Sequence, residues 1–153
     1  MTAKHFESKV VAAGAKHLYV PLPFDPAALW GDRDRYHVTG TVAGRRFRGV
    51  LEQRSGAYVL PLGSHWLREL IVKAGDAVAV VMDIEGPQRD ALADDIRTAL
   101  DAVPQAARFF DALAQFYRRG YLRWIDATKR SPDERARRIA EMVRLCQAGR
   151  KQK

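Results

Sequence analysis

The sequence has only one cysteine and no long apolar run, and these absences exclude several classes of protein. Cys146 stands alone among 153 residues, so the chain cannot form an internal disulfide framework or a cysteine-rich zinc site. No apolar stretch reaches the roughly 18–20 residues that a membrane-spanning helix requires. The first residues, MTAKHFESKVV, contain no hydrophobic core or cleavage site of a secretory signal. These features predict a soluble protein of the cytoplasm.

The chain also lacks the short motifs that usually mark catalytic or cofactor sites. It contains no GxSxG nucleophile elbow, no GxGxxG loop and no Walker-type phosphate loop. Asp32 and Asp34 alternate with arginines, which is typical of an exposed charged loop rather than of a general acid–base pair. The histidines are scattered through the first half, with no second histidine at helical spacing: His5, His17, His37 and His65. We therefore expect a protein that is not an enzyme and that has no cofactor or metal site.

The first half of the chain has the pattern of short strands separated by glycine-containing turns. The predicted strands lie within Phe6–Val11, Leu18–Leu22, Tyr36–Leu62 and Ala77–Ile84. Turns at Gly44 and Gly56 divide the third segment, and about six strands are enough for a small β-barrel. The continuous apolar run of the last segment predicts a strand covered on both faces. Before it, Ser64 is expected to cap a short helix whose apolar residues share one side: Trp66, Leu67, Leu70 and Ile71.

The second half changes to the period of α-helices. Leu92 begins a first helical stripe, and Pro104 fits the first turn of a second helix. Gly120 is expected to break or bend the chain before a third helix. Ser131-Pro132-Asp133-Glu134 is a capping box that starts the last helix, which we expect to end near Gly149.

These patterns divide the chain at Gly86-Pro87. The sequence predicts an α+β protein with a small β-barrel domain at residues 1–86 and a bundle of about four short helices at residues 87–153. The connection is too short for a flexible tether, so we expect the two halves to pack together. Cys146 falls on the inward face of the last helix, where a cysteine usually acts as a small hydrophobic residue.

Basic residues outnumber acidic ones by 26 to 18, which gives a formal charge of +8. From Ala91 onward there are 14 basic and 8 acidic residues, so most of the surplus belongs to the helices. The helical spacing predicts a basic face formed by four arginines: Arg119, Arg123, Arg137 and Arg144. Such a face is a solvated surface that maintains solubility, or a binding surface for an acidic protein partner or for nucleic acid.

Arg135 differs from these arginines because it falls within the apolar stripe of the last helix. An arginine in that position is usually partly buried and paired with a carboxylate, or lies along an aromatic ring. A second interpretation places it in a small-molecule pocket between barrel and helices, together with Tyr121 or Trp124.

Two families resemble the two halves. The first half resembles a small-barrel family of uncharacterised role in four stretches: VPLPFDPAALWG (20–31), VTGTVAGRRFRGVL (38–51), YVLPLGSHWLREL (58–70) and AGDAVAVVMD (74–83). The second half resembles the bacteriocin-protection family, also called YdeI or OmpD-associated, in three stretches: ALDAVPQAARFFDAL (99–113), YLRWIDATKRSPDERARRI (121–139) and the closing LCQAG.

The first resemblance implies a double-split β-barrel, an architecture shared with AbrB- and MazE-like transcription factors. The second implies a link to tolerance of bacteriocins and cationic antimicrobial peptides. Neither family supplies catalytic residues. The segment after the last strand, Asp83–Pro87, lacks the Arg-Asp pair that the small-barrel family carries there. The resemblance also implies that a set of motif residues joins two helices: Tyr121, Trp124, Arg135 and Arg138.

The sequence thus leads to two hypotheses about function. The first is a non-enzymatic bacterial binding protein linked to stress and antimicrobial-peptide tolerance. The alternative is a nucleic-acid-binding protein that uses the basic helical face, either as a monomer or as a barrel-mediated homodimer. The oligomeric state is left open by the sequence.

Overall fold

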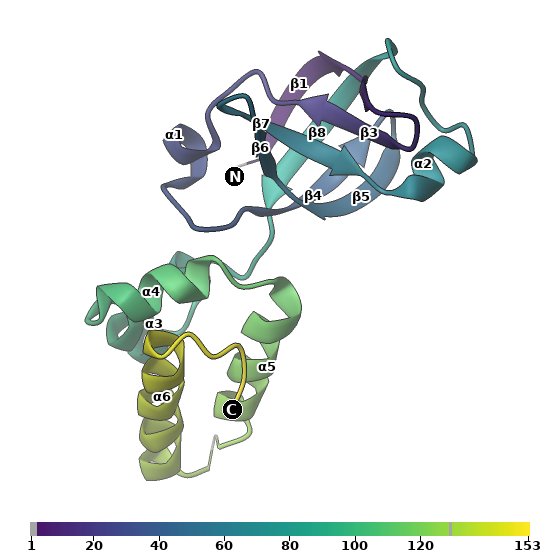
Figure 1. Ribbon diagram of the computed structural model, residues 1–153. Helices are drawn as coiled ribbons and strands as arrows, with labels where there is room; N and C mark the ends of the chain where they lie inside the picture. Colours follow the sequence, from purple (N-terminus) through teal and green to yellow (C-terminus); the bar gives the residue numbers. More distant parts are fainter. Residues whose placement is uncertain (1–2, 129) are drawn as a thin grey trace. The chain divides into compact units, whose positions relative to one another are not determined.

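The computed structural model describes residues 3–128 and 130–153, and the chain separates into two units (Figure 1). The first unit takes the described residues up to Asp32 together with Tyr36–Ile84, and the second takes Arg33–Arg35 together with Glu85–Lys153. The first unit is built mainly from strands, and the second is helical. The predicted α+β class is confirmed.

Eight strands form the first unit within the described residues, in two antiparallel four-stranded sheets. The sheet with the order β1-β8-β4-β5 consists of β1 (Lys4–Lys9), β8 (Ala77–Ile84), β4 (His37–Val42) and β5 (Arg45–Val50). The sheet with the order β2-β3-β7-β6 consists of β2 (Val11–Ala13), β3 (His17–Pro21), β7 (Ala57–Leu62) and β6 (Glu52–Arg54). Both sheets contribute to one hydrophobic core, as expected of a small barrel.

The strand number exceeds the predicted six because two extended segments each serve both sheets. The chain bends at Val10 between β1 and β2, and at Leu51 between β5 and β6. Both side chains are buried in the core. Their backbone N–H groups donate to Asp76 O (2.9 Å) and Tyr36 O (3.0 Å). A core-facing residue at the bend therefore divides one predicted strand into two.

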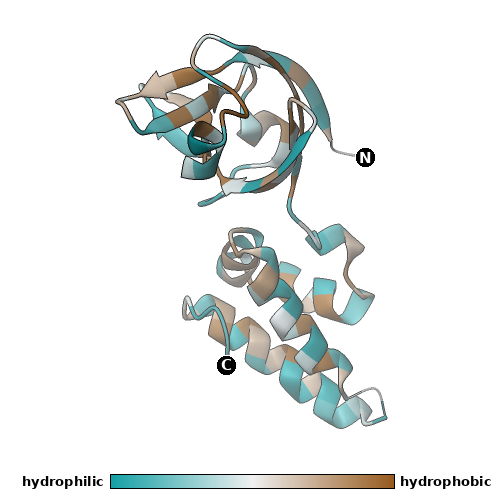
Figure 2. Ribbon diagram, turned by 90° about the vertical axis from the view of Figure 1, so that its right-hand side faces the viewer, coloured by the Kyte–Doolittle hydropathy of each residue, from teal (hydrophilic) through white to brown (hydrophobic). Residues whose placement is uncertain are grey.

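β8 is buried on one face only, which corrects the expectation of a strand covered on both faces. Val80 and Met82 are almost completely buried, whereas Ala77 and Ala79 are exposed. Hydrophobic and hydrophilic residues alternate along the strands of this unit (Figure 2). Two of the outward positions of β8 hold small alanines and a third holds Val81, so hydropathy alone overstated the burial of this strand.

Two short helices accompany the barrel strands within the described residues. The sequence prediction omits α1 (Pro26–Trp30), which is capped by the Asp25 side chain through the Ala27 N–H (3.0 Å). In α2 (Ser64–Arg68), Gly63 is the N-cap and Ser64 is the first helical residue, so the predicted serine cap is wrong. Leu70 is 81% exposed rather than packed, because the helix has ended and φ at this residue is +52°.

The second unit contains the predicted four helices within the described part of the chain. They are α3 (Asp94–Asp101), α4 (Pro104–Asp111), α5 (Gln115–Asp126) and α6 (Pro132–Gln147), preceded by a 3-10 turn at Arg89–Ala91. The predicted break at Gly120 is wrong, because this residue lies in the middle of α5. The chain turns instead at residues 112–114, between α4 and α5.

A buried arginine explains where that turn lies. Arg118 is 1% exposed, and its guanidinium lies 5.2 Å from the centre of the Phe110 ring. Its Nε donates to Leu113 O (3.0 Å), one terminal nitrogen donates to Pro87 O (2.7 Å), and the other donates to Asp111 O (2.5 Å). Burial lowers the pKa of the Arg118 guanidinium to about 10. One side chain of α5 thus satisfies the carbonyls that end α4 and connects them to the segment after β8.

The last helix begins and ends at local signals. The Ser131 hydroxyl accepts a hydrogen bond from the Glu134 N–H (3.3 Å), which confirms the predicted cap. At the other end Arg150 N donates to Leu145 O (2.9 Å), and Gly149 adopts φ +75°. Between these ends the inward side chains are fully or almost fully buried: Ile139, Met142, Val143, Leu145 and Cys146.

Replacing Arg118 is expected to destabilise the helical unit strongly. In Arg118→Met three carbonyl groups, one buried and two partly buried, lose their donor, and we expect the free energy of unfolding to fall by about 3 kcal/mol. Urea denaturation followed by circular dichroism measures this change. Arg119→Met is the matched control, because the neighbouring arginine is exposed and its loss should change stability by less than about 0.5 kcal/mol. Equal stability of the two variants would contradict the structural role of Arg118.

The serine cap of α6 gives a second, smaller expectation. Ser131→Ala removes the acceptor for the Glu134 N–H and should lower the free energy of unfolding by about 1 kcal/mol. Ser131→Asp keeps an oxygen at the same place and should retain the stability of the original chain. Thermal denaturation of the three proteins side by side distinguishes a loss of the cap from a general effect of substitution at this position.

Candidate functional site

The four arginines of the predicted basic face lie on α5 and α6, and all four are exposed. The two members of this face that lie on α6, Arg137 and Arg144, are already paired within their own helix. Arg137 contacts Glu134 (Nε–Oε1 3.2 Å), and Arg144 binds Glu141 with two nitrogens, one at 3.0 Å and one closer. These hydrogen bonds hold the pKa of Glu141 below its ordinary value. About half of the predicted positive face is therefore locally neutralised.

The two members of the basic face that lie on α5 differ in their pairing from the two on α6. Within the part of the chain that the structure describes, Arg119 and Arg123 make no side-chain hydrogen bond or ion pair. Phe116 lies one turn before Arg119 on the same exposed side and is 66% exposed. The sequence prediction omits Phe116, although its helical position opposite the buried Tyr121 and Ile125 places it on the outer face.

Arg135 is an ion-paired residue that joins three helices. Its Nε and one terminal nitrogen contact the two carboxylate oxygens of Asp95 on α3 (2.7 and 3.0 Å), and the other terminal nitrogen contacts Asp126 at the end of α5 (3.1 Å). The Arg135 side chain is 20% exposed. Hydrogen bonding to Arg135 lowers the pKa of Asp95 below its ordinary value. The arginine is thus partly buried and fully paired.

The remaining predicted contact residues form a separate cluster along α5. Arg138 donates to Trp124 O (2.7 Å), and its guanidinium lies 5.2 Å from the Trp124 ring centre. Lys153 Nζ lies 5.0 Å from the same ring centre. The Tyr121 hydroxyl donates to Arg150 O (2.6 Å), and burial raises the pKa of Tyr121 to about 12. The end of the chain is therefore held against α5.

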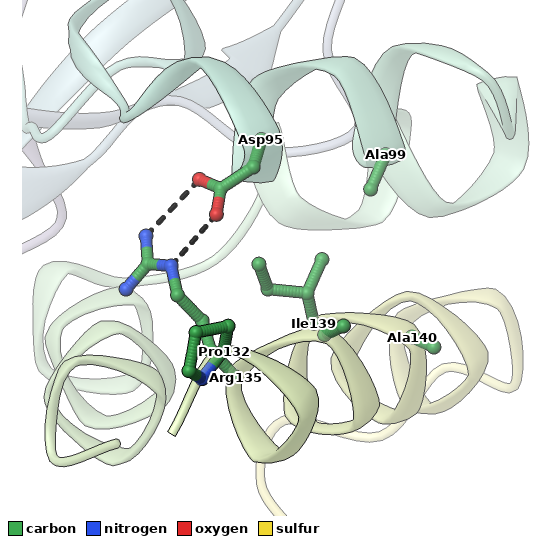
Figure 3. A pocket seen from close by; sticks show the side chains of 7 residues that line it. Asp95, Ala99, Pro132, Arg135, Ile139 and Ala140 are labelled. Carbon is green, nitrogen blue, oxygen red and sulfur yellow. Dashed lines mark hydrogen bonds and ion pairs between the residues drawn. The ribbon is translucent and has the colours of Figure 1, made fainter. Parts of the chain in front are cut away.

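A shallow pocket of about 350 Å³ lies between α3 and α6 (Figure 3). Asp95 and Arg135 face each other at one end of it (Figure 3). The remaining lining residues are apolar and mostly small: Ala99, Pro132, Ala136, Ile139 and Ala140. Neither Tyr121 nor Trp124 lines this pocket, so it does not combine Arg135 with either aromatic residue. Asp95 and Asp126 already occupy the Arg135 guanidinium, which opposes its use by a small-molecule ligand.

Other groups that could carry chemistry are engaged in the fold. Burial raises the pKa of the Cys146 thiol to about 12, which opposes formation of the reactive thiolate. Asp34 accepts a hydrogen bond from Arg108 Nε (2.9 Å). Among the described residues, no group of three or more histidine, cysteine or acidic side chains is arranged to hold a metal ion.

Fold and surface together define a protein with a small β-barrel followed by a helical unit with an arginine-rich surface. The chain belongs to the family described as Domain of unknown function (DUF1905), whose model matches residues 6–82. Residues 91–149 match the model described as Bacteriocin-protection, YdeI or OmpD-Associated. Both resemblances predicted from the sequence are thereby confirmed. A comparison with curated proteins gives no match. Among the described helices, none combines the length and the apolar character needed to cross a membrane.

The Asp95–Arg135 pair leads to an expectation for the dependence of stability on pH. The pKa of Asp95 is lower in the folded chain than the ordinary value of about 3.9, so the pair stabilises the fold above that pH and the contribution is lost as pH falls. Because the Asp95 side chain is 49% exposed, we expect Asp95→Asn to cost only about 0.5–1 kcal/mol at neutral pH.

Urea denaturation at neutral pH and near pH 2 measures this effect, and the two proteins should converge in stability at the acidic pH. Asp94→Asn is the matched control, because Asp94 is 90% exposed and pairs with Arg97 one turn away. A stability difference that stays constant between the two pH values would show that the Asp95 carboxylate charge does not contribute.

Proposed function

We propose that this protein is a non-enzymatic binding protein of the bacterial cytoplasm that holds an acidic protein partner on its helical unit. We also propose that this binding contributes to tolerance of bacteriocins or cationic antimicrobial peptides. The observation that carries the proposal is the pair of exposed arginines on α5, Arg119 and Arg123, which make no side-chain ion pair with any residue that the structure describes. They lie within a half of the chain that has a large positive surplus.

The charge of the chain favours an indirect contribution to tolerance. A protein with a formal charge of +8 repels cationic peptides, so direct capture of such a peptide is electrostatically unfavourable. An acidic partner is attracted by the same charge. The match of residues 91–149 to the bacteriocin-protection model supports the physiological part of the proposal.

Binding of an acidic polymer tests the molecular part. Labelled polyglutamate should bind with an affinity that falls as salt is raised from about 50 to about 200 mM, because the attraction between exposed charges is screened. Fluorescence anisotropy measures the binding, with polylysine as the matched probe of opposite charge. Absence of polyglutamate binding at the lower salt concentration would contradict the proposal.

Deletion of the gene tests the physiological part. The deletion strain should be killed at lower concentrations of bacteriocin or cationic peptide, and the original gene should restore tolerance. The Arg119→Gln/Arg123→Gln variant should restore it poorly at equal protein abundance. Unchanged tolerance after deletion would contradict this part of the proposal while leaving the binding measurement valid.

Nucleic-acid binding is the second candidate, and the surplus of 14 basic over 8 acidic residues from Ala91 onward favours it. Contacts to several phosphates would give an affinity that falls steeply with salt. Random single-stranded and duplex oligonucleotides in the same anisotropy assay test this candidate. Neutralising Arg119, Arg123, Arg137 and Arg144 together should then abolish binding without lowering the melting temperature.

A further inference from the structure

The middle of α5 carries a glycine that the fold of this chain does not require. Gly120 has no positive φ, and a Cβ atom built on it would meet no heavy atom within 4 Å. A glycine inside a helix destabilises it relative to alanine. Its presence therefore lowers helix stability at a position where the described residues leave space for a side chain.

Gly120 leaves a gap in the side-chain cover of α5, because it has no side chain and the space above it is open; we call this gap the notch. Side chains three and four positions away are neighbours on a helix. For Gly120 these neighbours are Phe116 and Tyr117 on one side and Arg123 and Trp124 on the other. A partner's side chain can thus approach the backbone of α5 more closely at Gly120 than at the neighbouring positions. We call Phe116, Arg119, Gly120 and Arg123 the α5 outer face.

The charges at this face are available to a partner. Most other arginines of the helical unit already have carboxylate or carbonyl partners, as described above for Arg118, Arg135 and Arg138. Arg119 and Arg123 have no such partner within the described residues, and the planar guanidinium group matches a carboxylate with two parallel hydrogen bonds. Arginine and phenylalanine are also enriched where protein interfaces are buried.

Two of the three aromatic rings near Gly120, those of Tyr117 and Trp124, already hold cations, which favours a protein partner over nucleic acid. Lys151 Nζ lies 5.4 Å from the Tyr117 ring centre, and Arg138 and Lys153 both contact the Trp124 ring. Rings that already hold cations on their faces are poor platforms for stacking bases. Two unpaired arginines also offer few phosphate contacts for tight nucleic-acid binding.

We infer that the α5 outer face is the docking site for an acidic protein segment in which an apolar side chain is flanked by carboxylates. The apolar side chain enters the notch at Gly120 beside Phe116, and the carboxylates pair with Arg119 and Arg123. This inference rests on the proposed binding of an acidic partner and specifies both the surface and the sequence character of the segment that it recognises.

The test uses a labelled peptide of glutamates with one central leucine, and the same peptide with alanine at the centre. The full chain should bind the leucine peptide several-fold more tightly in fluorescence anisotropy. Arg119→Gln/Arg123→Gln should weaken binding about tenfold, a loss on the scale of interface hot spots. The matched control is Arg137→Gln/Arg144→Gln, which removes the same charge from the paired arginines of α6 and should change affinity by less than about twofold.

Gly120→Ala separates binding from folding, because the variant is expected to raise stability while lowering affinity for the peptide. The variant should raise the melting temperature by about 2–4 °C, since alanine favours the helix. It should nevertheless weaken binding of the leucine peptide, because the added methyl group fills the notch. A merely structural role of the glycine would not lower affinity while stability rises.

Three outcomes would overturn the inference. In the first, the α5 and α6 double variants lose affinity equally and Gly120→Ala binds as the original chain does. The partner would then respond to the total charge of the helical unit, and the proposed function would stand. Tighter binding of a single-stranded oligonucleotide with the same variant pattern would assign the face to nucleic acid. Failure of the original chain to bind either peptide or polyglutamate would remove the proposed function as well.

Discussion

The hydrogen bonds of the buried Arg118 guanidinium set the geometry on which the helical unit depends. This one side chain binds carbonyl oxygens at Leu113 and Asp111, where α4 ends, and at Pro87, in the segment that follows β8. A buried guanidinium is costly unless its donors are satisfied. The orientation of α5 about its own axis is therefore fixed by the need to keep Arg118 among these carbonyls. That orientation also determines which residues of α5 face outward. Phe116, Arg119 and Arg123 are exposed because Arg118, Tyr121 and Ile125 are buried.

Arginines in this unit have several different roles, although their number alone suggests one basic surface. Arg118 holds backbone carbonyls, and Arg135 connects α3, α5 and α6 through two carboxylates. Arg137 and Arg144 are paired within one helix, where exposed ion pairs add little to stability. Formal charge therefore overestimates the positive surface that a partner can meet. What remains is a short, localised face, which suits an acidic segment of a protein better than a long nucleic acid.

The sequence predicted the fold where local signals and periodicity agreed. The capping box at Ser131, the restart at Pro104 and the hairpin turns at Gly44 and Gly56 all lie as expected. The error at Gly120 arises because residue composition does not reveal the side-chain contacts that hold α5 together. A glycine in this position predicts a helix break. A helix nevertheless tolerates one glycine when tertiary contacts stabilise the neighbouring residues, and the hydrogen bonds of Arg118 provide such contacts.

At the candidate site, helical periodicity predicts which arginines are exposed, but ion pairing decides which of them are available to a partner. Helical phase correctly placed four arginines on the surface, but phase alone cannot tell Arg119 from Arg137. The distinction arises because Glu134 lies three residues before Arg137, whereas Phe116 lies three residues before Arg119. An acidic residue at that spacing neutralises an exposed arginine within its own helix. A phenylalanine at the same spacing leaves the arginine unpaired and adds apolar surface beside it, so the two helices present opposite properties to a partner despite their similar charge.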